Sequence, residues 1–122
     1  MGAYSNPASR AEALARVADA LLRALGSSQI ILLLPTPTEQ VEQLLLAPAV
    51  VRRIGGARRR RLEVMLSAAT VKTQAEAHGC DPPTLFDAAL GMLHGGKLLR
   101  IESVDWASFE DVPYLYRIIV TD

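Results

Sequence analysis

Arginine is the residue type whose spacing in this sequence most suggests chemistry. The chain has eleven arginines, and six fall within the ten residues "RRIGGARRRR": Arg52, Arg53, Arg58, Arg59, Arg60 and Arg61. A guanidinium group is permanently charged and binds phosphate or carboxylate oxygens through paired hydrogen bonds. The cluster is therefore a candidate contact for DNA or for an acidic protein surface. Its two glycines equally suit a solvated hairpin tip, whose charges discourage edge pairing.

Side chains that could bind a metal or catalyse a reaction do not form a recognisable motif. His78, Cys80 and Asp81 lie close together, but a zinc site needs three or four ligands in regular spacing, and the sequence has no second group. No Gly-x-Ser-x-Gly elbow, phosphate loop or dinucleotide fingerprint is present. We therefore expect no metal, no cofactor and no catalytic residue, and a protein that is not an enzyme.

Acidic and aromatic residues gather near the C-terminal end of the sequence. The segment "DWASFED" contains Asp105, Trp106, Phe109, Glu110 and Asp111. Paired carboxylates can perform acid–base chemistry, and aromatic rings can stack on bases, although nearby carboxylates repel phosphates. We predict an acidic hairpin loop that contacts a protein partner. An enzyme whose site is assembled from these acids is a third hypothesis.

The composition describes a small protein with no net charge. Its 122 residues suggest one domain, 1–122, and half are hydrophobic, which is enough for a packed core. Thirteen basic and thirteen acidic side chains cancel, whereas a wide nucleic-acid-binding face usually has a basic excess. The single cysteine excludes an internal disulfide, and we see neither a secretory leader nor a membrane span. We expect maturation in a cytoplasm, without a membrane partner.

The N-terminal segment predicts a flexible start over residues 1–8 and a helix over residues 9–25. Ser9 and Glu12 have the spacing of a capping box, and Gly26 supplies a C-terminal stop. Helical periodicity places six apolar residues on one face, which we expect to pack inward: Leu14, Val17, Ala18, Leu21, Leu22 and Leu25.

The next segments predict strands and a charged hairpin. Residues 29–34 suit a short buried strand, and in the strand 41–54 Pro48 requires an edge position or a bulge. After a glycine turn the pattern alternates, with Leu62, Val64 and Leu66 on one face. The arginines then lie at the tip and shoulders of a hairpin from Val50 to Leu66. We expect Gly55–Arg59 to be mobile, because neighbouring like charges repel one another.

The remainder predicts helices followed by strands. Ser67 can cap a helix over residues 68–78, and a second helix follows over 82–90. Gly95 and Gly96 then join two strands in a tight turn, and the last strand is rich in aromatic and β-branched residues. The fold class is therefore α+β. We expect a small antiparallel β-barrel over residues 29–122, with an N-terminal helix and one or two helices inserted near 68–90.

The C-terminal third resembles a known family. The segments "LGMLHGGKLLRIESV" and "VPYLYRIIVTD" are similar to the end of small neck proteins of tailed bacteriophages, the head-completion or head-closure proteins of the head-to-tail connector. The resemblance covers residues 90–122 well and residues 41–66 loosely. It departs from the family at the N-terminal helix and at the two inserted helical segments. Adaptor and tail-terminator proteins are similar in size and therefore stay open as alternatives.

The resemblance implies a structural role without catalysis. A homo-oligomeric ring would join the portal to the tail in the neck of a phage or prophage virion, leave a channel for DNA, and assemble in the host cytoplasm. The arginine hairpin would face an acidic neighbour or the channel. The alternative hypothesis from the residues is a small nucleic-acid-binding β-barrel that uses the same arginines.

Overall fold

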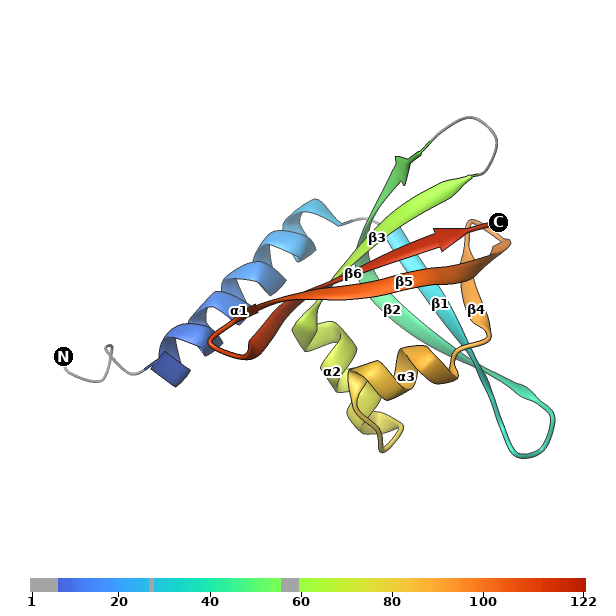
Figure 1. Ribbon diagram of the computed structural model, residues 1–122, viewed down its shortest axis with the longest axis horizontal. Helices are drawn as coiled ribbons and strands as arrows, with labels where there is room; N and C mark the ends of the chain where they lie inside the picture. Colours follow the sequence, from blue (N-terminus) through green and yellow to red (C-terminus); the bar gives the residue numbers. More distant parts are fainter. Residues whose placement is uncertain (1–6, 27, 56–59) are drawn as a thin grey trace.

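The computed structural model describes residues 7–26, 28–55 and 60–122. In this part of the chain, six antiparallel strands close into a barrel in the order β1-β2-β3-β6-β5-β4, accompanied by three helices (Figure 1). The predicted α+β barrel with an N-terminal helix and inserted short helices is confirmed. The elements are α1 (Pro7–Leu25), β1 (Ser28–Pro35), β2 (Val41–Ile54), β3 (Arg61–Ser67), α2 (Ala68–Ala77), α3 (Pro82–Ala88), β4 (Gly91–His94), β5 (Lys97–Phe109) and β6 (Val112–Thr121).

Aliphatic side chains that alternate along the strands fill the barrel. Leu62, Val64 and Leu66 of β3 are buried, as predicted, and Ile30 and Leu32 of β1 are buried in the same cluster. A strand sends every second side chain to the same face, so each strand contributes one row to the interior. Full burial of one such side chain contributes about 1.5–3 kcal/mol, which makes this cluster the main source of stability.

β2 is long enough to belong to two walls of the barrel, and Pro48 lies where it passes between them. The first part of β2 pairs with β1, and the part from Val50 onward pairs with β3. The pairing register with β1 shifts between Ser28 and Ile30, opposite the segment that contains Pro48. Because proline has no N–H to donate to the ladder, an edge position or a bulge was expected here, and the register shift shows that the strand is irregular at this point.

The hairpin of β5 and β6 corrects the prediction of an acidic loop. Asp105, Trp106 and Phe109 lie within β5, and only Glu110 and Asp111 form the turn. Both turn residues have positive φ, 50° and 65°, as a two-residue hairpin turn requires. The prediction was wrong because it weighed the low strand propensity of the acids alone. Cross-strand side-chain pairs with β6, including an aromatic pair at Trp106, extend the ladder instead.

The two-residue glycine turn between β4 and β5 is confirmed. His94 and Lys97 are paired across it, and the intervening Gly95 and Gly96 have φ values of 58° and 75°. A residue with a side chain is strained in this backbone region, so glycine is the residue that permits the tight turn here.

The inserted helices begin at side-chain caps. Ser67 Oγ accepts a hydrogen bond from the Thr70 amide at 3.2 Å, which confirms the predicted cap of α2. One side of α2 packs into the barrel core, where Val71 is fully buried. α3 begins after Asp81, whose carboxylate accepts a hydrogen bond from the Thr84 amide at 2.9 Å. The sequence pattern had indicated the start of α3 through its prolines alone.

The start of α1 differs from the prediction. The helix begins at Pro7, so Ser9 lies in its first turn and is not the residue before the helix. Proline favours the first turn, because its missing N–H would have no helical partner there. Of the segment 1–8 that we expected to be flexible, residues 1–6 lie outside the described residues, and residues 7 and 8 are helical.

The apolar surface of α1 is wider than the barrel can cover. α1 packs against β6, β3, β2 and α2, and it buries Ala11 and Leu22 there. Val17, Leu21 and Leu25 face away and are exposed, which contradicts the prediction that they pack inward. A helix that rests on one wall buries a single stripe of its surface. The rest of its apolar face stays in contact with solvent.

Candidate functional site

The arginine hairpin is the first candidate site. β2 and β3 form the expected hairpin, with Ile54 paired to Arg61. Arg58 and Arg59, and with them most of the segment that we expect to be mobile, lie outside the described residues. The other four arginines of the cluster are described, two at the end of β2 and two at the start of β3: Arg52, Arg53, Arg60 and Arg61.

Two of these arginines already bind carboxylates of the same chain. Arg52 Nη2 lies 2.9 Å from Glu63 Oε1. Arg61 donates two hydrogen bonds to Glu102, from Nε at 3.1 Å and from Nη2 at 2.9 Å. A forked pair of this kind orients the guanidinium group and neutralises its charge. The shoulders of the hairpin therefore present less positive charge than the sequence suggested.

Glu63 is a buried charged residue whose burial sequence analysis missed. It lies on the outer face of β3, as the alternation predicted, yet it is only 3 % exposed. Arg52 and Arg117 both bind its carboxylate and cover it. A buried carboxylate is stable only with such partners. The register of the hairpin was the available signal for this ion pair, because it places Glu63 opposite Arg52.

Asp122, which directly follows β6, places another carboxylate beside the arginine hairpin. Asp122 Oδ1 accepts a hydrogen bond from the Arg60 amide at 3.2 Å, and Asp122 Oδ2 lies 2.8 Å from Lys97 Nζ. The hydrogen bond from Lys97 lowers the pKa of the Asp122 carboxyl. The hairpin thus lies beside carboxylates rather than on a uniformly basic surface.

The predicted acidic and aromatic residues lie on the β5–β6 hairpin and not beside the arginine cluster. Asp105 pairs across the strands with Arg117, and Glu110 lies 3.7 Å from Arg10 of α1. The Trp106 ring is half exposed and lies 6.3 Å from the Tyr116 ring, centroid to centroid. This arrangement gives Asp105 and Glu110 basic neighbours in the same chain and leaves Trp106 on the surface.

The His78–Cys80–Asp81 group has structural contacts. His78 Nε2 lies 3.5 Å from Glu42, Asp81 caps α3, and the Cys80 thiol packs against the core. Hydrogen bonds from Thr84 lower the pKa of the Asp81 carboxyl. Within residues 7–26, 28–55 and 60–122, no three histidine, cysteine or acidic side chains gather closely enough to hold a metal ion.

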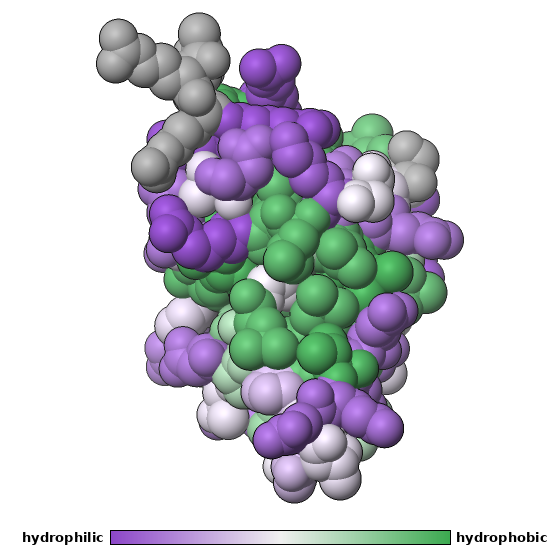
Figure 2. Space-filling view, turned by 90° about the vertical axis from the view of Figure 1, so that its right-hand side faces the viewer, coloured by the Kyte–Doolittle hydropathy of each residue, from purple (hydrophilic) through white to green (hydrophobic). Residues whose placement is uncertain are grey.

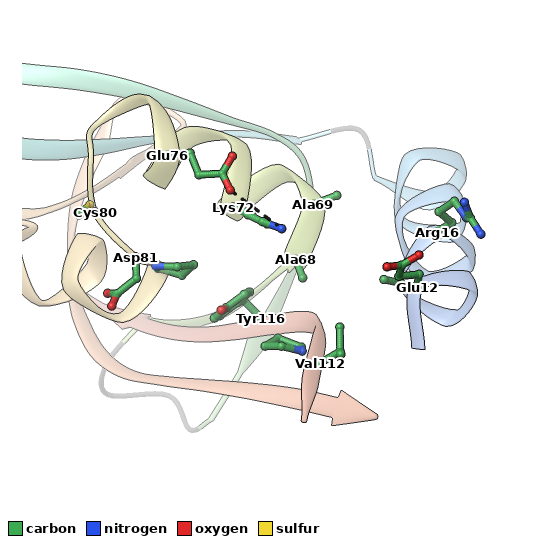
Figure 3. A pocket seen from close by; sticks show the side chains of 13 residues that line it. Glu12, Arg16, Ala68, Ala69, Lys72, Glu76, Cys80, Asp81, Val112 and Tyr116 are labelled. Carbon is green, nitrogen blue, oxygen red and sulfur yellow. Dashed lines mark ion pairs between the residues drawn. The ribbon is translucent and has the colours of Figure 1, made fainter. Parts of the chain in front are cut away.

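A groove of about 650 Å³ lies between α1, α2 and the start of β6. Tyr116 lines it, and burial, assisted by the nearby Asp81 carboxylate, raises the pKa of the Tyr116 phenol. Lys72 and Glu76 form an ion pair at the rim. The groove therefore has an apolar wall and a charged rim, and it suits an apolar side chain of a partner. Figure 3 shows side chains from all three elements around it, including Glu12, Arg16, Ala68, Ala69 and Val112.

The largest feature that sequence analysis missed is an apolar surface on the outside of the barrel. Strand pairing aligns one aliphatic residue from each of four strands, in the order Leu45 (β2), Ile31 (β1), Leu93 (β4) and Leu98 (β5). Figure 2 shows this surface as a continuous hydrophobic area. With its neighbours, this set is named the barrel face: Ile31, Leu33, Val41, Leu45, Leu90, Leu93 and Leu98.

The barrel face is exposed to an unusual degree. Val41, Leu45, Leu90 and Leu98 are each about half exposed, and Leu90 reaches 58 %. Contiguous apolar surfaces of this kind mark sites where another molecule binds. The run "IILLL" was a signal, because a strand apolar on both faces needs cover on both sides.

The second apolar surface is the outward side of α1. Val17, Leu21 and Leu25 follow one another at intervals of four residues, and Leu25 is 72 % exposed. Three exposed alanines lie beside them on the same side of the helix. This set is named the helix stripe: Ala13, Val17, Ala20, Leu21, Ala24 and Leu25.

Comparison with known proteins identifies no relative. No protein-family model, no curated protein and no solved structure matches this chain. Among the described residues, no helix combines the length and apolar character that crossing a membrane requires. The function must therefore be argued from the two apolar surfaces and the charged hairpins themselves.

Proposed function

We propose that this protein is a structural subunit that assembles with copies of itself and with neighbouring proteins. One observation carries the proposal: the barrel face and the helix stripe are both exposed, and they lie on opposite sides of the molecule. α1 packs on the β3 and β6 side, whereas β1 and β4 close the barrel on the other side (Figures 1 and 2). The two surfaces cannot cover each other within one chain.

Two different surfaces on opposite sides favour head-to-tail contacts between copies. Such contacts build rings where the rotation between subunits closes, and filaments where it does not. This geometry agrees with the family that the C-terminal segments resemble. We accordingly propose a non-enzymatic neck protein of a phage or prophage, placed in a ring between portal and tail. Head completion is the preferred role, and adaptor or tail terminator are the alternatives within the same class.

Electron microscopy of the concentrated protein tests the proposal. The expected result is a population of rings with a central channel, or of short filaments, that grows with protein concentration. Analytical ultracentrifugation of the same samples should give a mass that rises with concentration. A chain that stays monomeric from micromolar to millimolar concentration, at low and at high salt, would overturn self-assembly as its function.

A further inference from the structure

We infer that the helix stripe of one copy binds the barrel face of the next. This inference rests on the proposed function and specifies its interface. Both surfaces are aliphatic and exposed in the isolated chain, so water leaves both when they meet. The occupant of each surface is then a second copy of the same chain.

The dimensions of the two surfaces match. The large side chains of the helix stripe span the eight-residue interval from Val17 to Leu25, which is about 12 Å at 1.5 Å per residue. On the barrel face, the interval from Val41 to Leu45 along β2 covers about 13 Å, and four strands are about 14 Å across. A helix about 10 Å in diameter therefore covers most of the barrel face.

The details of the surfaces suit a helix lying on a sheet. Small residues let a helix approach a neighbour closely, and Ala20 and Ala24 lie between the larger residues of the stripe. At one edge of the barrel face, a hollow of about 390 Å³ lies between Leu90 and Leu98. Leu25 protrudes at the end of α1 and can occupy such a hollow.

Charge gives the contact a direction. Arg100 and Asp122 both line the hollow, and Lys97 binds the Asp122 carboxylate, so Arg100 is the basic group that faces the hollow. The C-terminal end of a helix carries a partial negative charge, which Arg100 attracts. Glu39 lies beyond Val41 at the other end of the barrel face, and Arg16 borders the helix stripe on α1. When the C-terminal end of α1 of one copy lies at Arg100 of the next copy, Arg16 of the first copy approaches Glu39 of the second.

A pair of complementary variants tests the contact. The stripe variant carries Val17→Lys and Leu21→Lys and keeps its barrel face. The face variant carries Leu45→Glu and Leu98→Glu and keeps its helix stripe. All four positions are exposed, so we expect both variants to fold, with circular dichroism spectra and unfolding midpoints close to those of the wild type. Ala77→Lys, on the exposed side of α2, serves as a matched control that should assemble normally.

Sedimentation of the variants alone and mixed gives the decisive result. We expect each variant alone to be monomeric and the equimolar mixture to stop at a heterodimer. In that heterodimer, the intact stripe of the face variant would bind the intact face of the stripe variant. A face variant that dimerises alone would show that stripes bind each other, and a stripe variant that dimerises alone would show that faces bind each other. Either result overturns this interface and leaves self-assembly standing.

Disulfide trapping supplies a second measurement. In a Cys80→Ser background, copies with Leu21→Cys are mixed with copies with Leu45→Cys and oxidised. We expect cross-linked heterodimers in large excess over either homodimer. A predominance of one homodimer contradicts the inference. A wild-type chain that never oligomerises overturns the proposed function itself, so the two failures are distinguishable.

Discussion

At the scale of single residues, Asp19 fastens α1 to the start of α2. Its carboxylate accepts a hydrogen bond from the Ser67 hydroxyl at 2.6 Å, and the same Ser67 caps α2. We expect Asp19→Asn to lower the free energy of unfolding by about 1 kcal/mol, because the charged acceptor is lost. Denaturant unfolding at neutral pH measures the loss. Asp87→Asn, at an exposed position of α3, is the control and should be neutral.

The same contact predicts a dependence on pH. The hydrogen bond from Ser67 lowers the pKa of Asp19 below its ordinary value of 3.8 in the folded state. The folded state therefore holds its proton less tightly than the unfolded state, and the contribution of Asp19 is present above pH 3.8. It is lost as the pH falls through the folded pKa. In unfolding experiments, the difference in unfolding free energy between the wild type and Asp19→Asn should shrink as the pH falls below 3.8. A difference that grows with acidity would contradict the assignment.

The buried ion pairs of Glu63 support a second prediction about a single residue. Glu63→Gln leaves Arg52 and Arg117 without their shared carboxylate, and we expect a loss of about 1–2 kcal/mol in unfolding free energy. Glu102→Gln is the matched control, because it breaks the exposed pair with Arg61, and exposed pairs contribute about 0–1 kcal/mol. If the two variants lose the same free energy of unfolding, burial does not make the Glu63 ion pairs more stabilising than the exposed Glu102 pair.

At the scale of elements, the β5–β6 turn is built from residues that resist its conformation. Asp111 has a φ of 65°, a region that glycine enters freely and that β-branched residues avoid. We expect Asp111→Gly to raise the thermal midpoint by a few degrees, consistent with a gain of about 0.5–1 kcal/mol. Asp111→Val should lower it. Equal midpoints for both variants would show that the turn relaxes without cost.

Hydrogen exchange compares the central strand with the arginine hairpin. β6 is paired on one side with β3 and on the other with β5, so we expect the amides of Ile118 and Ile119 to exchange slowly. We expect the same of Ile101 in β5, which pairs with Val120. The expectation that Gly55–Arg59 exchange fast stays a prediction from sequence, because residues 56–59 are outside the described part. Protection at Gly55 equal to that of β6 would mean that the hairpin tip is already held within the fold.

The elements also show what the sequence could specify. The bulge at Pro48, the cap at Ser67 and the Gly95–Gly96 turn were predictable, because each depends on the residue's own backbone or on a contact with a residue three positions away. The β5–β6 turn was misplaced, because strand pairing overrode the local preference of the acids. The burial of Glu63 and the exposure of one side of α1 were not predictable, because both depend on which elements pack against each other. Periodicity identifies an apolar face, but it does not tell how much of that face a neighbour buries.

At the scale of the whole molecule, the distribution of charge limits binding to nucleic acid. Of the four clustered arginines that the structure describes, Arg52 and Arg61 bind carboxylates in the chain. The nucleic-acid alternative expects about four phosphate contacts from the whole cluster. If the nucleic-acid alternative holds, a titration with duplex DNA should show a log–log salt slope of about −3.6, from roughly −0.9 per contact. Replacing Arg58–Arg61 by alanine should abolish binding to the DNA. No binding at low salt would remove this alternative.

The position of β6 within the barrel has a consequence for synthesis of the protein. β6 occupies residues 112–121, yet it lies between β3 and β5 and closes the barrel by pairing with both. A ribosome must therefore deliver β6 before the barrel can close. Until then, the barrel is open between β3 and β5, and the apolar inner side chains along that gap are not covered. Pairing across such a long stretch of chain is slow, so chaperones have their main opportunity to bind during that interval.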